Sequence, residues 1–274
     1  MTTQNFELQA KTLIDDLKGV CANYGLGNDG NEFKIITQVF LYKFLNDKFA
    51  YSVKQAMPEL QGNPDWIPAL KQMPEEDYEM LKAELPAGVA ELQPGQLLEE
   101  LFHQQDKKGS EGIAKKFDDT LLDIARQNSD IFSVKTESGA KINLFDRITE
   151  YIADPSVRDE FCKALLNKLV HFSFEHTFSE KRDFFAGIFE YLIKDYNKDS
   201  GGKYAEYYTP HAVGKIMARC LVIEAVQSVT CYDPGAGSGT LLMTLAHAIG
   251  QEKCAIYSQD ISQKSSSLLR LNLI

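Results

Sequence analysis

The stretch Val229-Thr-Cys-Tyr-Asp233-Pro234-Gly235-Ala236-Gly237-Ser238-Gly239-Thr240 decides how this sequence folds. A short β-rich segment, residues 226–232, ends at an acidic residue and leads into a loop with three glycines. The apolar segment 240–249 that follows has the length and composition of a helix. Glycines permit positive φ and a close approach of the backbone to a ligand, because they carry no Cβ. The stretch therefore predicts a sharp strand-to-helix turn that leaves room for a ligand.

A second strand is predicted downstream at 253–259, and a further helix begins within 262–273. Strand, loop, helix, strand and helix in this order open a nucleotide-binding α/β sheet. Asp260 follows the second strand, where a carboxylate can accept both ribose hydroxyl hydrogens. Asp233 ends the first strand, where a carboxylate can meet an ammonium group. A nucleoside with a cationic amino group fits both carboxylates, and S-adenosylmethionine has those parts.

Three other interpretations of the loop stay open on these residues alone. A dinucleotide fingerprint needs G-x-G-x-x-G, and Thr240 stands where the last glycine should fall. A phosphate-binding P-loop needs a lysine after its last glycine, and none follows Gly239. The loop could also be a tight turn that binds no ligand.

The region before the loop is predicted to be mostly helical. Apolar residues recur with a helical period over 6–24, 33–53, 115–128, 157–172 and 184–196, whereas prolines divide 54–115 into short helices. The polar stretch 197–202 indicates a break between domains. Thr209-Pro210 then predicts a helix entry for 211–223, with Thr as cap and Pro at the first helical position.

Composition indicates a soluble globular protein. The 274 residues are 44% hydrophobic and 25% charged, and no apolar run approaches the roughly 18 residues of a membrane span. The N-terminus lacks the features of a secretory signal, so we expect a cytoplasmic location. The five cysteines and five histidines show no metal-ligand spacing, so we expect reduced cysteines and no metal site.

The charge is unevenly distributed. Residues 1–200 hold 23 Lys and Arg against 34 Asp and Glu, a net of −11, whereas residues 201–274 hold 6 against 5, a net of +1. A protein that holds DNA by itself usually has a basic surface. If DNA is the substrate, another subunit or a local basic patch must supply most of the attraction.

Several motifs resemble those of modification subunits of type I restriction–modification systems. Residues 202–213, Gly-Lys-Tyr-Ala-Glu-Tyr-Tyr-Thr-Pro-His-Ala-Val, resemble that family's Gly-Glu-Phe-Tyr-Thr-Pro-x-x-Val, which forms one wall of the cofactor site. The glycine loop is similar to the family's Asp-Pro-Ala-Cys-Gly-Ser-Gly-Gly, with Gly235-Ala236 and Thr240 as departures. Tyr257-Ser-Gln-Asp260 resembles its Tyr-Gly-Gln-Glu, and residues 32–47 resemble the start of its N-terminal helical domain.

The resemblance implies an α/β fold that is mostly helical overall. An all-helical domain over 1–175 precedes the start of a Rossmann-like S-adenosylmethionine-dependent methyltransferase domain over 176–274. The implied enzyme transfers a methyl group to the exocyclic amine of adenine in DNA. The implied partners are a specificity subunit, a restriction subunit and, through their complex, double-stranded DNA; no membrane is involved. The residues expected to bind the cofactor are Tyr207, Tyr208, Thr209, Pro210, Asp233, Pro234, Gly235, Gly237, Ser238, Gly239, Thr240, Asp260 and Ile261.

One motif of the family is missing from the sequence. The Asn/Asp-Pro-Pro-Tyr/Phe tetrapeptide, which holds a flipped adenine, occurs nowhere in these residues. We therefore expect a truncated chain that carries no catalytic residue and does not methylate DNA alone. An alternative is an assembly or regulatory module that binds a specificity subunit without catalysis. RNA methylation and a fused restriction–methylase use the same chemistry and also stay open.

Overall fold

The computed structural model describes residues 3–27, 30–86, 88–106, 112–132, 134–135, 141–178, 191, 209–261 and 269. The chain divides into two compact units, Met1–Arg182 and Asp183–Ile274. Helices dominate the first unit, and the second contains a small two-stranded parallel sheet. No helix among these residues is long and apolar enough to cross a membrane.

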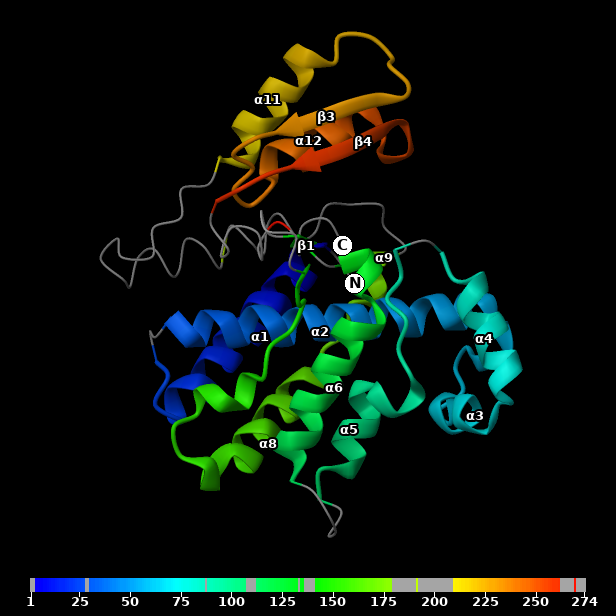
Figure 1. Ribbon diagram of the computed structural model, residues 1–274, viewed down its shortest axis with the longest axis vertical. Helices are drawn as coiled ribbons and strands as arrows, with labels where there is room; N and C mark the ends of the chain where they lie inside the picture. The colour runs from blue at the N-terminus through cyan, green and yellow to red at the C-terminus, as the bar shows by residue number, and fades with distance from the viewer. Residues whose placement is uncertain are drawn as a thin grey trace. The chain divides into compact units, whose positions relative to one another are not determined.

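The first unit is built around one long helix. Helix α2 (Gly30–Ala56) crosses the whole unit in Figure 1 and buries residues on every side of its axis. A helix that is apolar all round belongs in the middle of a core. The other helices that enclose this core are α1 (Thr3–Asn23), α6 (Ile113–Gln127) and α8 (Arg158–Leu169). The apolar periodicity of the sequence correctly predicted all four helices.

The proline-rich region forms short helices separated by turns, as predicted. These are η1 (Pro58–Leu60), α3 (Trp66–Gln72), α4 (Glu75–Glu84), η2 (Pro94–Gln96) and α5 (Leu98–Gln104). Four further short elements follow α6: α7 (Ser129–Phe132), η3 (Ile148–Tyr151), η4 (Pro155–Val157) and α9 (Glu175–Phe178). Strands β1 (Val134–Lys135) and β2 (Lys141–Ile142) pair antiparallel, and the sequence pattern did not predict them.

Aromatic side chains pack the segment that ends in α9 against α2. Phe174 is fully buried, and its ring lies within 5.5 Å of the rings of Phe40 and Phe44. Phe178 makes a similar edge contact with Phe44 at 5.3 Å. Phe6 of α1 reaches the same cluster through Phe172, at 5.4 Å. These contacts join both ends of the first unit, and each ring pair adds about 0.5–1.5 kcal/mol beyond area burial.

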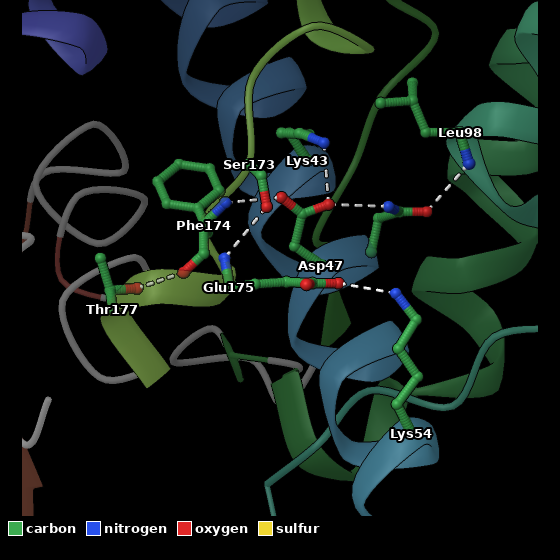
Figure 2. Close-up of polar contacts among 9 residues, drawn as sticks. Lys43, Asp47, Lys54, Leu98, Ser173, Phe174, Glu175 and Thr177 are labelled. Carbon is green, nitrogen blue, oxygen red and sulfur yellow. Dashed lines mark hydrogen bonds and ion pairs between the residues drawn. The ribbon is translucent and has the colours of Figure 1, made fainter. Parts of the chain in front are cut away.

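A buried polar network reinforces the same junction (Figure 2). Asp47 accepts hydrogen bonds from Lys43 Nζ at 2.8 Å, from Asn46 Nδ2 at 2.9 Å and from the Phe174 N–H at 2.8 Å. Asn46 in turn accepts the Leu98 N–H at 2.9 Å, which ties α5 to α2. Burial raises the pKa of Asp47, and its contacts with Lys43, Phe174 and Asn46 oppose that rise. The network satisfies every named group while joining three segments.

Lys54 forms a second, more exposed link between the same elements. Its Nζ lies 2.9 Å from Glu175 Oε1 and 5.0 Å from the centre of the Trp66 ring. Figure 2 shows Lys54 of α2 and Glu175 of α9 beside the Asp47 network. Such half-exposed ion pairs contribute at most about 1 kcal/mol.

The second unit contains helices α11 (His211–Leu221) and α12 (Thr240–Ile249), strands β3 (Val229–Asp233) and β4 (Cys254–Ser258), and the turn η5 (Gln251–Lys253). β3 and β4 are parallel, with Val229 opposite Cys254 and Asp233 opposite Ser258. Within residues 209–261 the predicted helices and strands are all present, displaced by no more than a few residues at their ends. The helices predicted within 184–196 and 262–273 lie outside the described residues.

The core of the second unit lies between the sheet and α12. It is formed by Cys231, Ala236, Leu242 and Leu269, with Leu245, Ile249, Cys254 and Ile256 packed around them. Helix α11 packs on α12, and a Cβ at Gly214 would lie only 3.1 Å from Thr244 Oγ1. Figure 1 shows α12 behind the two strands and α11 beside it.

Much of the apolar surface of the second unit is exposed. Tyr232 and Tyr257 stand opposite each other in the register of the sheet and are 58% and 60% exposed. On α11 the large apolar residues face outward, with Ile216 64% and Leu221 69% exposed. Only the small residues Gly214 and Ala218 of this helix are buried.

Candidate cofactor-binding site

The glycine loop connects β3 to α12 in the second unit. Gly237 and Gly239 have φ of +54° and +81°, in the left-handed region that favours glycine. A Cβ at Gly239 would also collide with the end of the Leu269 side chain, so the backbone conformation favours glycine there and any other residue would displace Leu269. The sequence correctly predicted the sharp turn from strand to helix.

The backbone amides of the loop donate to acceptors within the protein. The Gly235 N–H donates to Asp233 Oδ1 at 3.0 Å, and the Gly237 N–H donates to Asp260 Oδ2 at 2.8 Å. Between them, the Ala236 N–H donates to the carbonyl of Gln259 at 3.0 Å. The two acidic residues predicted from the sequence therefore meet on one loop.

Gln259 is a member of this arrangement that the sequence analysis missed. Its N–H donates to the Asp233 carbonyl at 3.0 Å, so it extends the parallel ladder of β3 and β4 onto the loop. Its side chain accepts the Tyr232 hydroxyl hydrogen at 3.0 Å. The register of two parallel strands could have identified it, because the residue after the second strand faces the turn after the first.

The hydrogen bonds of the loop restrict the ligands that it can accept. The pyrophosphate of a dinucleotide binds the backbone N–H groups of such a loop. Here four of those groups, including the Gly239 N–H that donates to the Ala236 carbonyl at 2.7 Å, donate to protein oxygens, and two of the four acceptors are carboxylates. A pyrophosphate would have to displace these acceptors and sit beside their negative charge. A ligand with a cationic amine and hydroxyl groups would instead find its hydrogen-bond acceptors in place.

Two hydroxyl groups mark the start of α12. Ser238 Oγ and Thr240 Oγ1 lie 3.0 Å apart, and Gly239 is the N-cap residue between them. The N–H groups of the first turn of a helix have no partner within the helix and point out beyond its N-terminus. They therefore attract the negatively charged part of a ligand. The structure therefore places predicted residues Ser238 and Thr240 where a ligand carboxylate could be held.

The remaining predicted residues lie in the loop, after β4 or before α11 in the sequence. Pro234 and Ile261 are exposed; Ile261 follows Asp260 and presents its whole side chain to solvent. Thr209 and Pro210 begin α11, whereas Tyr207 and Tyr208 lie outside the described residues.

The predicted cap of α11 is wrong. Pro210 rather than Thr209 is the N-cap residue, and no side chain caps the helix. Pro210 has ψ of 135°, which is not helical, and its carbonyl accepts the N–H groups of Val213 and Gly214 at 2.9 and 3.1 Å. The helix therefore begins one residue later than a proline at the first helical position requires.

Cys231 is a buried residue of β3, the strand that leads into the loop. It is buried in the core of the second unit, two residues before Asp233. Burial, followed by the influence of Cys254, raises the pKa of its thiol. It therefore acts as a small hydrophobic residue, as predicted, and not as a nucleophile. Cys220, in contrast, is exposed on α11.

Comparison with known proteins relates the chain to DNA methylases. Residues 180–274 match the family model described as N-6 DNA methylase. The methylase subunit of the type I restriction enzyme MpnII from Mycoplasma pneumoniae is 24% identical over 257 residues, covering 90% of this chain and 46% of that protein. The chain therefore spans about half the length of this relative.

A solved structure shares the fold. The methyltransferase subunit of a type I restriction–modification system from Streptococcus thermophilus superposes with a TM-score of 0.68, covering 99% of this chain and 56% of that one. The sequences are 21% identical, so this match supports the fold alone. The mostly helical architecture with its small parallel sheet therefore matches the fold of that solved structure.

Proposed function

We propose that this chain, whose residues 180–274 match the N-6 DNA methylase family model, binds S-adenosylmethionine as part of a DNA adenine methyltransferase. The enzyme would be the modification subunit of a type I restriction–modification system, working in the cytoplasm. The helical domain would comprise residues 1–175, and residues 176–274 would be the start of a Rossmann-like methyltransferase domain.

One observation carries the proposal: two carboxylates meet on the glycine loop through Gly235 and Gly237. Asp233 would accept hydrogen bonds from the cofactor's ammonium group, and Asp260 would accept them from the ribose hydroxyls. The cofactor's carboxylate would lie at the start of α12, near Ser238 and Thr240. S-adenosylmethionine supplies the methyl group, and these residues bind and orient it.

The rest of the reaction would need groups from outside these residues. The sequence has no Asn/Asp-Pro-Pro-Tyr/Phe tetrapeptide to hold the base, and its net charge of −10 does not favour DNA. We therefore propose that this chain alone does not methylate DNA. A specificity subunit and a restriction subunit would join it on double-stranded DNA.

Equilibrium titration tests the cofactor site. S-adenosylmethionine should bind the 274-residue chain, and NAD should not. Asp233→Ala should weaken S-adenosylmethionine binding by about 10- to 100-fold, because a hydrogen bond to a charged group is worth about 1.5–3 kcal/mol. Glu224→Ala, which removes an exposed carboxylate of the same unit, is the matched control and should bind normally. NAD binding with no S-adenosylmethionine binding would refute the proposal.

An assembly module is the second candidate function. The observation that favours it is the exposed apolar side of α11, which includes Ile216 and Leu221. If this candidate is correct, S-adenosylmethionine will not bind, but a purified specificity subunit will still associate with the chain. Binding of S-adenosylmethionine that is lost in Asp233→Ala would rule out a module without a cofactor.

A further inference from the structure

We infer that Asp260 is a positioning residue, which holds the glycine loop in its binding shape through the Gly237 amide. This role is separate from the contact with ribose proposed above and exists before any ligand binds. It rests on the proposed function only for its effect on the cofactor. The carboxylate would therefore serve the site twice, once through the loop and once through the ligand.

Contacts at the glycines themselves do not fix the first half of the loop, although Ala236 between them is buried in the core. A Cβ at Gly235 or Gly237 would meet no heavy atom of the described residues within 4 Å. Gly239 differs, because it lies against Leu269. Glycine without neighbours can adopt many backbone conformations, including those with positive φ. Some other constraint must select the conformation with φ of +54° at Gly237.

Hydrogen bonds from the end of β4 supply that constraint. The Gln259 N–H donates to the Asp233 carbonyl, and the Gln259 carbonyl accepts the Ala236 N–H, each at 3.0 Å. Asp260 adds the next contact by accepting the Gly237 N–H at 2.8 Å. The first two bonds use only the backbone, so any residue at 259 except proline can make them. The third needs a side-chain acceptor, so it depends on the identity of residue 260.

The bond to Gly237 also orients the carboxylate. Asp260 is half-buried, and its Oδ2 is directed at the loop amide. Because this hydrogen bond restricts rotation of the side chain, the carboxylate is ordered before a ligand arrives. Preorganisation of this kind lowers the entropy that binding costs. A ligand's ribose would therefore meet an acceptor already held in place.

Amide exchange in the ligand-free chain tests the positioning role directly. Asp260→Ala removes the acceptor, and exchange of the Gly237 amide should accelerate by about tenfold or more. Asp260→Asn retains a carbonyl oxygen and should keep exchange close to that of the wild-type chain. Glu224→Ala is again the matched control. Equal exchange in wild-type and Asp260→Ala chains would overturn the inference.

A binding cycle separates the two roles of Asp260. S-adenosylmethionine and its 2′,3′-dideoxyribose analogue are titrated into wild-type and Asp260→Ala chains. A residue that only contacts ribose would leave the binding of the analogue unchanged by the substitution. If Asp260 positions the loop, the Asp260→Ala substitution should also weaken binding of the analogue, by about tenfold. Unchanged binding of the analogue would overturn the inference.

Two outcomes keep the inference and the proposed function distinguishable. If S-adenosylmethionine does not bind the wild-type chain, the proposed function fails, but Gly237 exchange still decides the positioning role. If the Asp260→Ala variant does not fold, a measurement on the wild-type chain tests the positioning role instead. A through-hydrogen-bond coupling between the Gly237 nitrogen and the Asp260 carboxyl carbon should then be present by NMR, and its absence would overturn the inference.

Discussion

Asp47 of the first unit and Asp260 of the second make the same hydrogen bond in very different surroundings. Each accepts the N–H of a residue from another segment at 2.8 Å, Phe174 in one case and Gly237 in the other. Asp47 is buried beside Lys43 within a complete core, whereas Asp260 is half-buried at the edge of a two-stranded sheet. Enclosure makes the first carboxylate a structural link. Access to solvent leaves the second within reach of a ligand.

The cores of the two units differ in the same way. The first packs large, fully buried side chains together, such as Tyr42 and Phe49 of α2 and Phe117 of α6. The second buries only a few apolar residues, two of them small, between its sheet and α12. The large apolar side chains of α11 are exposed. We therefore expect substitutions in the first unit to act on stability, and those in the loop of the second to act on both stability and binding.

The largest effect is expected from Asp47→Ala. It leaves Lys43 buried without its counter-charge and removes the acceptor of the Phe174 N–H. Breaking a buried ion pair by removing one partner costs about 3–5 kcal/mol. The free energy of unfolding, measured by urea denaturation, should fall by that amount.

The double variant Lys43→Met with Asp47→Leu is the control. It removes both charges together and should lose less stability than Asp47→Ala alone. If Asp47→Ala costs under about 1 kcal/mol, Lys43 reaches water easily and the proposed contrast between the two carboxylates is wrong.

Gly239→Ala should have the next largest effect, confined to the second unit. An alanine there must adopt positive φ and collides with Leu269. The two penalties together amount to about 2–4 kcal/mol. Unfolding of this unit followed by hydrogen exchange in α12 should show the loss, and S-adenosylmethionine binding should fall with it.

Gly235→Ala is the matched control for Gly239→Ala. Gly235 does not have positive φ, and a Cβ there meets nothing within 4 Å among the described residues. Its stability should change by no more than about 0.5 kcal/mol. Equal losses in the two variants would show that the loop tolerates no side chain at either position, contrary to the geometry.

Asp118→Asn should change the pH dependence of the first unit. Burial raises the pKa of Asp118, although Thr149 and Arg147 oppose the rise. The folded state therefore holds this proton more tightly than the unfolded state, so stability falls as pH rises from the ordinary carboxyl range through the folded pKa. Above the folded pKa the contribution is constant.

Asparagine cannot titrate but keeps an acceptor for the Thr149 N–H. Subtracting the stability of the variant from that of the wild-type chain should give a small downward slope with pH, measured by denaturation at several pH values. An upward slope would mean that the contacts of Asp118 outweigh its burial.

The smallest effect is expected from Ile216→Lys on α11. The side chain is 64% exposed, so the stability of the second unit should change by no more than about 0.5 kcal/mol. Ala218→Leu on the buried side of the same helix is the control and should cost about 1–3 kcal/mol by overpacking. Equal costs would show that the outward side of α11 is covered in solution.

Local signals in the sequence predicted most of the fold. The apolar repeat of α2 and the glycine loop before α12 each lie within a few turns of chain, and both were predicted correctly. The β1–β2 pair was missed because two-residue strands are too short to show an alternating pattern. The capping of α11 depended on a single residue, which a sequence pattern does not resolve.

The sequence predicted the candidate site in part. Asp233 and Asp260 were identified from their places at the ends of strands, and the structure brings both to the glycine loop. That Asp260 binds the Gly237 amide could not be predicted, because it depends on how the two strands are paired, whereas the bond between Asp233 and the Gly235 amide is a local contact over two residues. The Asp47 network was missed for a related reason: its partner Phe174 lies 127 residues away, far beyond any local pattern.

That separation has a consequence for synthesis of the chain. The first unit cannot close until Phe172 and Phe174 have left the ribosome to meet Phe6 and Asp47. At about 5–20 residues per second, the 127 residues between Asp47 and Phe174 take roughly 6–25 s to make. Throughout that interval α2, which the folded unit buries on every side, lacks the segment that completes its cover. Nascent chains should therefore expose α2 to chaperones until the aromatic residues around Phe174 emerge.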